Sequence, residues 1–172
     1  MSMRYASLVL YVSTVLWLPA IWGTPRYACA QAEEALLRVE GEVGRPLTLS
    51  HAAFAQLPRT VVQVRDRDGT DSAYAGVLLR DILVLAGVPL GEQLRGDRLA
   101  MYVVVEALDK YLVIFALPEL DAAFTDRVVL LADRRDDQPL PAAEGPLRLV
   151  IPDEKRHARW VRFGLEYHGD RA

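Results

Sequence analysis

Alternating residues, β-branched residues and short apolar runs together indicate that most of this chain forms short strands. Residues 37–43 (LRVEGEV) alternate as in a strand with one buried face. Residues 60–64 (TVVQV) are rich in β-branched side chains, which favour strands. Further strands are expected at residues 99–105, 111–116, 128–132 and 147–151, with a final pair at 159–162 and 164–167.

Helical spacing is confined to short segments. Ser50 is placed to cap a helix over residues 51–56, which ends ahead of Pro58 because a residue that precedes proline avoids the helical region. Apolar residues at helical spacing over 77–86, followed by Gly87, predict a second helix. One more helical turn is expected at 118–122. Many strands and few short helices, without regular alternation, predict a mixed α+β, mainly β fold.

The N-terminus has the order of parts found in a secretory signal. Arg4 precedes an uncharged apolar stretch over residues 5–22, and Ala28-Cys29-Ala30 then offers small residues for cleavage. We therefore predict a signal peptide over residues 1–30, a single domain over 31–172, and a periplasmic or secreted protein.

Two other readings of this segment stay open, a membrane anchor and a lipid-modified Cys29. The apolar stretch is at the lower limit for a spanning helix, which needs about 20 residues. Pro19, Gly23 and Pro25 interrupt it near its end. These breaks favour cleavage, so no stable membrane span is expected in the exported form.

Composition excludes several classes of function. The 172 residues are 52% hydrophobic and carry a net charge of −3, which gives no electrostatic basis for binding nucleic acid. Cys29 is the only cysteine, and cleavage after Ala30 would remove it. The exported form would then have no thiol for a disulfide, for metal binding or for thiolate chemistry.

The usual catalytic and metal-binding patterns are missing from the sequence. His51, His157 and His168 are scattered, without the short spacing of a zinc site. Carboxylates gather at residues 66–71 and 133–137, where turns are expected and Asp bonds locally to backbone. No serine lies in a Gly-x-Ser-x-Gly turn. No catalytic residue and no metal ligand is therefore assigned.

One segment concentrates positive charge in an otherwise acidic chain. Residues 145–162 (GPLRLVIPDEKRHARWVR) contain Arg148, Lys155, Arg156, Arg159 and Arg162. Strand-like alternation here would place Arg156 and Trp160 on one face and His157, Arg159 and Val161 on the other. Guanidinium groups in a cleft suit phosphate or carboxylate oxygens. The alternative is a solvated basic face with weak ion pairs.

The order of segments resembles the molybdopterin-binding oxidoreductase domain of the sulfite oxidase family. The matching pieces extend over nearly all of residues 31–172. They are LTLSHAAFAQLP at 47–58, GVLLRDILVLAGV at 76–88, ALDKYLVIFAL at 107–117, VVLLADRRDDQPLP at 128–141 and the basic segment at 145–162.

This resemblance implies a fold of β-sheets with short helices and a cleft for a pterin that chelates molybdenum. In the family a basic segment near the end of the domain contacts the pterin phosphate. By position that role falls on Arg156 and Arg159, with Arg148 nearby. Together with Lys155 these are the candidate cofactor-binding residues, and molybdopterin is the cofactor that the resemblance implies.

The chain also departs from the family pattern. Family enzymes supply a cysteine thiolate to the metal after the strand that corresponds to residues 60–64, and that place lies close to Asp66 here. Lys110 replaces an expected glycine. We therefore expect a non-catalytic exported module that binds a small anionic ligand or an exported protein partner. The alternative is a molybdopterin-dependent oxidoreductase in which an oxygen ligand, such as Asp66 or water, replaces the thiolate.

Overall fold

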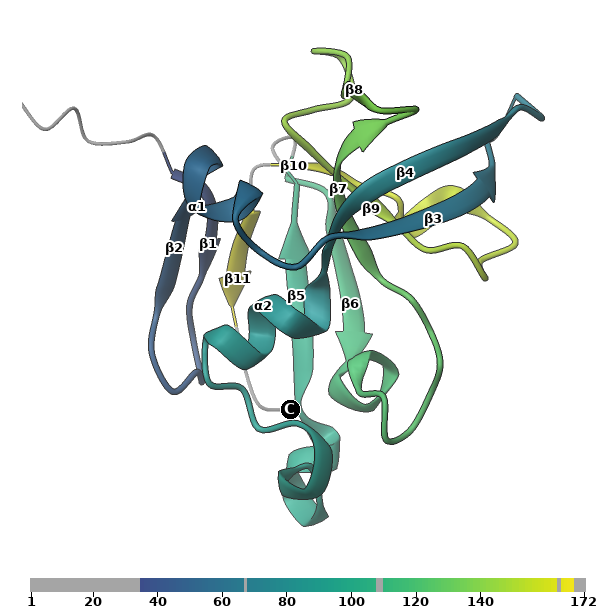
Figure 1. Ribbon diagram of the computed structural model, residues 1–172. Coiled ribbons are helices and arrows are strands. Elements are labelled where there is room, and N and C mark those ends of the chain that lie inside the picture. The colour runs from purple at the N-terminus through teal and green to yellow at the C-terminus, as the bar shows by residue number, and fades with distance from the viewer. Residues whose placement is uncertain (1–34, 67, 108–109, 164, 169–172) are drawn as a thin grey trace, which may run out of the picture. The chain divides into compact units, whose positions relative to one another are not determined.

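Two β-sheets make up most of the domain in the computed structural model (Figure 1). The structure describes residues 35–66, 68–107, 110–163 and 165–168. These residues belong to a compact unit that spans residues 32–172. The predicted signal peptide lies outside the described residues. The predominance of strands over short helices confirms the mixed, mainly β fold expected from the sequence.

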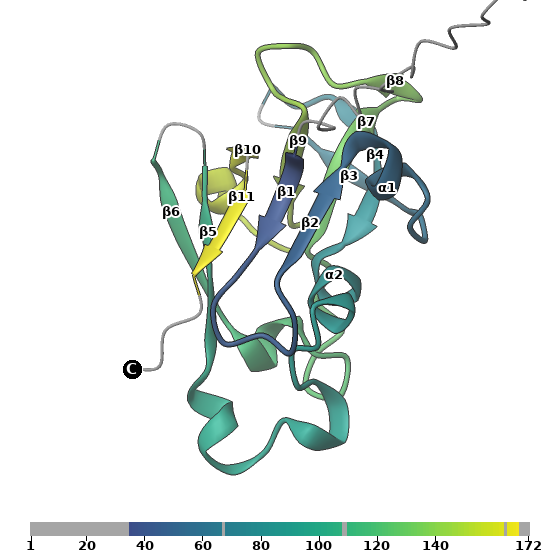
Figure 2. The same cartoon turned by 90° about the vertical axis from the view of Figure 1, so that its left-hand side faces the viewer.

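The first sheet has the strand order β2-β1-β11-β5-β6 (Figure 2). The pairing of β1 with β11 is parallel, and the other pairings in this sheet are antiparallel. Strand β11 comes from the end of the described chain and inserts between β1 and β5. The strands are β1 (Ala35–Val39), β2 (Leu47–Ser50), β5 (Tyr102–Glu106), β6 (Leu112–Ala116) and β11 (Leu165–His168).

The second sheet has the order β10-β9-β7-β4-β3, and β8 pairs with β7. All its pairings are antiparallel. Strands β3 and β4 form a long hairpin that extends to the right in Figure 1. The strands are β3 (Thr60–Arg65), β4 (Asp71–Leu78), β7 (Leu130–Arg135), β8 (Gln138–Pro139), β9 (Leu147–Val150) and β10 (Arg162–Phe163).

The helices are short, as the sequence pattern predicts. Ser50 caps the first helix, because its side-chain oxygen accepts a hydrogen bond from the backbone N–H of Ala53. None of the helices in the described residues is long and apolar enough to cross a membrane. The α-helices are α1 (His51–Ala55) and α2 (Leu79–Leu85), and the 3₁₀ helices are η1 (Gly91–Gln93), η2 (Gly96–Ala100), η3 (Leu117–Leu120) and η4 (His157–Arg159).

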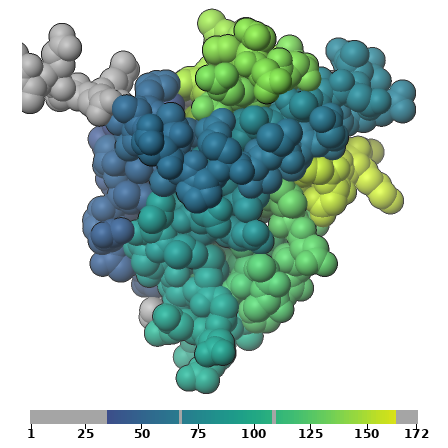
Figure 3. Space-filling view, viewed as in Figure 1, coloured from purple at the N-terminus to yellow at the C-terminus, as the bar shows by residue number. Residues whose placement is uncertain are grey.

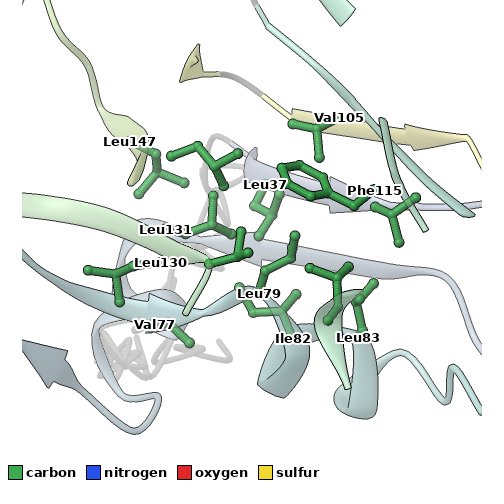
Figure 4. Packing of buried hydrophobic residues seen from close by; sticks show 14 of the residues in the cluster. Leu37, Val77, Leu79, Ile82, Leu83, Val105, Phe115, Leu130, Leu131 and Leu147 are labelled. Atoms are coloured by element: carbon green, nitrogen blue, oxygen red, sulfur yellow. The ribbon is translucent and has the colours of Figure 1, made fainter. Parts of the chain in front are cut away.

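Buried side chains from both sheets and from α2 form one hydrophobic cluster (Figure 4). In β5 and β6 alternate residues are buried, as expected for strands with one covered face. In β7 the run from Leu130 to Ala132 is buried throughout. Burial of this apolar surface stabilises the sheets and fixes the positions of the loops at their ends.

Strand β4 is the main element that the sequence pattern did not predict. Four of its residues Asp71–Leu78 are small, which weakens the alternation, although Ser72 and Tyr74 do alternate with more exposed neighbours. The predicted helix over 77–86 accordingly begins later, at Leu79. Its predicted end is confirmed, because Gly87 follows it with a φ of +77°.

Four strand predictions were wrong in their extent. The strand expected at 37–43 spans Ala35–Val39, and the strand expected at 128–132 spans Leu130–Arg135. The expected strand at 99–105 begins at Tyr102, because residues 96–100 form the 3₁₀ helix η2. The expected strand at 159–162 is reduced to Arg162–Phe163, because His157–Arg159 form η4. The backbone N–H of Trp160 donates to the carbonyl of His157 and closes this turn. The two-faced arrangement expected for residues 156–161 is therefore wrong.

Gly76 marks a β-bulge at which β4 crosses closely over β7. A Cβ at this position would lie 2.6 Å from the Cα of Ala132 and closer still to the carbonyl oxygen of Leu131. Because both neighbours are backbone atoms, they cannot move aside without disturbing the sheet.

We expect Gly76→Ala to lower the free energy of unfolding by about 3 kcal/mol. Gly69→Ala is the matched control: its Cβ would meet no atom within 4 Å, so only its positive φ of +88° opposes it. That control should cost about 1 kcal/mol. Urea denaturation followed by circular dichroism measures both values, and equal losses would contradict the steric explanation.

Candidate functional site

A cleft of about 620 Å³ lies between the end of β3 and the loop that follows β9. The loop, residues 152–159, is hereafter called the basic loop. It lies below the β3–β4 hairpin at the right of Figure 1, and Figure 3 shows this yellow segment at the same edge of the surface. The cleft is lined by Val64, Arg65, Asp66, Pro152, Glu154, Lys155, Arg156, His157, Ala158 and Trp160.

The two acidic residues of the basic loop, Asp153 and Glu154, form ion pairs with Arg127 and Arg159. The Nε of Arg127 donates to Asp153 at 3.0 Å, and its Nη1 donates to Glu119 at 2.6 Å. Arg159, at the end of the loop, pairs with Glu154 and also reaches Glu119 at 3.3 Å. Glu119 in η3 thus joins the two arginines and ties the loop to the first sheet's β6–η3 segment.

Arg159 makes further contacts that fix the loop against β6. Its Nη1 donates to the carbonyl of Ile114 at 3.4 Å, and its guanidinium carbon lies 4.5 Å from the centre of the Phe115 ring. The Phe115 side chain is buried in the core. A cation over an aromatic ring adds an attraction of about 0.5–1 kcal/mol at exposed sites. Arg159 is therefore committed to structural contacts.

The other two cations of the loop are available to a ligand. Lys155 and Arg156 line the cleft, are exposed, and have no carboxylate partner among the residues that the structure describes. Arg65 adds a third positive charge from the end of β3, with its Nε donating to the carbonyl of Gly69 at 3.1 Å. Because Glu154 is engaged by Arg159, it does not neutralise these cations directly. The cleft thus presents free positive charge.

Asp66 occupies the β3 side of the cleft, where a partly buried hydrogen-bonded chain supports it. The hydroxyl of Tyr74 lies 3.1 Å from each carboxylate oxygen of Asp66. The Nη1 of Arg148 donates to the Tyr74 oxygen at 2.9 Å and to Glu144 at 2.6 Å. Arg135 completes the chain by donating to Glu144 at 3.1 Å.

Arg148 does not line the cleft but packs beneath one of its walls. Its guanidinium carbon is 5.4 Å from the centre of the Tyr74 ring and 5.5 Å from that of Trp160. Its side chain is 15% exposed, and its buried Nε makes no hydrogen bond. The acidic partner Glu144 and the two rings hold the charge in place.

Trp160 forms the apolar wall between the cleft and this buried chain. Its indole N–H donates to the carbonyl of Ile151 at 3.2 Å. The ring of His157 stacks on it with centres 3.8 Å apart, and the Tyr74 ring meets it edge-on at 6.1 Å. The wall is rigid because each side of the indole has a partner.

The candidate residues therefore divide into two groups. Of the four that the sequence singles out, Lys155 and Arg156 line the cleft, whereas Arg148 and Arg159 are paired with glutamates next to it. Arg162 donates to the carbonyl of Ala143 and lines a separate cavity of about 350 Å³. Tyr74 and Glu144 were not identified from the sequence as site residues.

The acidic clusters behave differently from each other. Asp68 accepts from the backbone and side chain of Thr70, as expected for a turn, and these bonds lower the pKa of Asp68. Asp136 and Asp137 have positive φ angles at the β7–β8 turn. Asp66 differs because it lines the cleft. The described residues contain no group of three side chains suited to hold a metal ion.

The donor set fits the anionic part of a molybdopterin cofactor but not its metal. Exposed Lys155 and Arg156 can bind phosphate oxygens. In the family that the sequence resembles, a cysteine thiolate binds the metal, and residues 30–172 contain no cysteine. The carboxylate of Asp66 is the anionic oxygen group on the β3 side of the cleft, and it is hydrogen-bonded to Tyr74.

We expect Tyr74→Phe to lower the free energy of unfolding by about 1–3 kcal/mol, because it removes a buried hydroxyl that bonds to both Asp66 and Arg148. Burial raises the pKa of Tyr74 above its ordinary value of 10.0. The proton is held more tightly in the folded state, so this contribution is present below pH 10 and declines as the pH rises through the higher, folded-state value.

Urea denaturation of both proteins at neutral pH and at about pH 11 tests this expectation. The stability difference between wild type and variant should shrink at the higher pH. Tyr102→Phe is the control and should change stability little, because Tyr102 is only partly buried and its hydroxyl makes no hydrogen bond in the described residues. A Tyr74→Phe protein as stable as wild type at neutral pH would show that the buried chain contributes nothing.

Comparison with solved structures shows where this fold occurs. The chain is similar to the sulfane dehydrogenase SoxCD from Paracoccus pantotrophus, with 21% sequence identity and a TM-score of 0.58. The alignment covers 77% of this chain and 38% of that chain, so this chain spans well under half of its length. At this identity the likeness establishes the fold. No curated protein sequence matches the chain.

A family model gives the assignment directly. The model described as the oxidoreductase molybdopterin binding domain matches residues 24–163, which include the second sheet, every strand of the first sheet except β11, and the entire cleft. This match confirms the resemblance drawn from the sequence. The chain therefore belongs to the family of sulfite oxidase-type, molybdopterin-binding oxidoreductase domains.

Proposed function

We propose that this chain is an exported binding module that holds a small anionic ligand in the cleft and does not carry out oxygen-atom transfer. The proposal depends chiefly on one observation: Lys155 and Arg156 line the cleft without carboxylate partners in the described structure, while the acidic residues beside them are engaged by arginines. The export segment and the periplasmic or secreted location are parts of the same proposal.

Absence of the thiol supports the non-catalytic role. Oxygen-atom transfer in the family relies on a metal held by a protein thiolate. Asp66, an oxygen donor, lies close to the place where the resemblance puts that cysteine, so the thiolate of the family pattern is missing from this side of the cleft. A family scaffold can carry a different site without change of fold.

The anion site predicts a specific loss of binding. Replacing both Lys155 and Arg156 by alanine should weaken binding of ethyl phosphate at least about tenfold, because each side chain can supply a charge-assisted hydrogen bond. Arg95→Ala is the control: Arg95 is also exposed, lies before η2, and does not line the cleft. Isothermal titration calorimetry at low ionic strength gives the affinities.

Added salt should weaken binding to the wild type more than to the double variant, because mobile ions screen exposed charges. Equal affinity of wild type and double variant would refute the anion site.

The guanidinium of Arg156 can donate several hydrogen bonds in a fixed geometry, which the ammonium of a lysine cannot do. Arg156→Lys should therefore recover only part of the affinity that Arg156→Ala loses.

A second function is favoured by the position of Asp66. Because Asp66 lines the cleft, it is a candidate oxygen ligand in a molybdopterin-dependent oxidoreductase. Elemental analysis of protein exported from a host that makes the cofactor separates the two proposals. Our proposal predicts molybdenum far below one atom per chain. One atom per chain in the wild type, lost in Asp66→Ala, would establish the alternative.

The remaining possibility is that the module serves chiefly as a subunit for an exported protein partner. That role predicts co-purification of one defined protein and no binding of ethyl phosphate. Measurable phosphate binding that disappears with Lys155 and Arg156 would instead support the small anionic ligand.

A further inference from the structure

We infer that the cleft selects ligands in which an anionic group is accompanied by a separate N–H or ammonium donor, with Asp66 as the acceptor for that donor. This inference rests on the proposed function and deepens it. The cations of the basic loop recognise one part of the ligand, and the carboxylate on the β3 side recognises another. The substrate class is thus aminoalkyl phosphates or carboxylates and related dipolar compounds.

Asp66 is held as a fixed acceptor. Its carboxylate is oriented by Tyr74, whose side chain is fully buried, and Tyr74 is oriented by Arg148. Arg148 is fixed in turn by Glu144. Because these hydrogen bonds already fix its orientation, the Asp66 carboxylate loses little conformational entropy when a ligand binds.

The carboxylate has acceptor capacity that the protein does not use. An ionised carboxylate can accept about four hydrogen bonds. In the described structure the Tyr74 hydroxyl, with its single proton, is the donor to both oxygens of Asp66. The backbone N–H groups of the hairpin are directed elsewhere: that of Asp66 bonds to the Thr70 carbonyl, and that of Thr70 bonds to Asp68.

The same carboxylate disfavours ligands that are only anionic. A phosphate drawn in by Lys155 and Arg156 approaches the negative charge of Asp66 on the opposite wall of the cleft. Like charges in a partly desolvated site repel, whereas a donor group between them removes the repulsion and gains a charge-assisted bond. A ligand with both groups therefore satisfies both walls.

Matched pairs of ligands test this inference on the full chain. Each ω-aminoalkyl phosphate, from the ethyl to the hexyl member, is compared with the alkyl phosphate of the same length by isothermal titration calorimetry. For at least one length the amino compound should bind about tenfold more tightly to the wild type. The series is needed because the spacing between the two groups of the ligand must match the width of the cleft.

Asp66→Asn is the decisive variant, because its amide oxygen can still accept from Tyr74 while the charge is lost. It should abolish the preference for the amino compound and tighten binding of the simple alkyl phosphate, because the repelling charge is removed. Asp68→Asn is the matched control: it removes the same charge from the same hairpin, from a residue that bonds to Thr70 and does not line the cleft. This control should retain the preference.

The possible failures are distinguishable. If alkyl phosphates bind but no amino compound is preferred at any length, the role of Asp66 is refuted and the anion site stands. If Asp66→Asn weakens both members of a pair equally, Asp66 only maintains the fold, and the inference is again refuted. If neither member binds to the wild type, the proposed function fails together with the inference.

Discussion

The site depends on the ion pairs that Arg159 and Arg127 make with Glu154, Asp153 and Glu119. These bonds join the basic loop to η3 and, through the Ile114 carbonyl and the Phe115 ring, to β6. The same ion pairs neutralise the negative charges of Asp153 and Glu154. Because the acids are engaged by arginines, Lys155 and Arg156 remain available at the cleft. Loop geometry and cleft electrostatics therefore have one cause.

The opposite wall is built in a different way, from a buried chain that begins at Glu144 and ends at Asp66. Tyr74 and Arg148 fix the position of the Asp66 carboxylate. They add no net positive charge next to it, since the charge of Arg148 is balanced by Glu144. Trp160 separates this chain from the loop and contacts both sides. A fold that binds a pterin and a metal in other members of the family can thus present a fixed carboxylate in this chain.

The sequence predicted the class of the fold and most of its strands, because β-branched residues at 60–64 and apolar runs at 111–116 and 147–151 are typical of strands, and each of these segments contains one. It also identified the basic segment. It did not separate Arg159 from Arg156, because ion pairing with Glu119 joins residues that are 40 positions apart. Tyr74 was missed since β4 has small residues that obscure its period, and its partner Arg148 lies 74 positions away.

An anion bound on the basic loop side of the cleft would change the chemical environment of the residues around it. Amide and guanidinium NMR shifts recorded during titration with ethyl phosphate detect such changes residue by residue. We expect the shift changes to cluster at Arg65, Lys155, Arg156 and His157, which line the cleft. Changes centred on the alanine-rich cavity around Ala142 and Arg162, or no changes at all, would contradict this expectation.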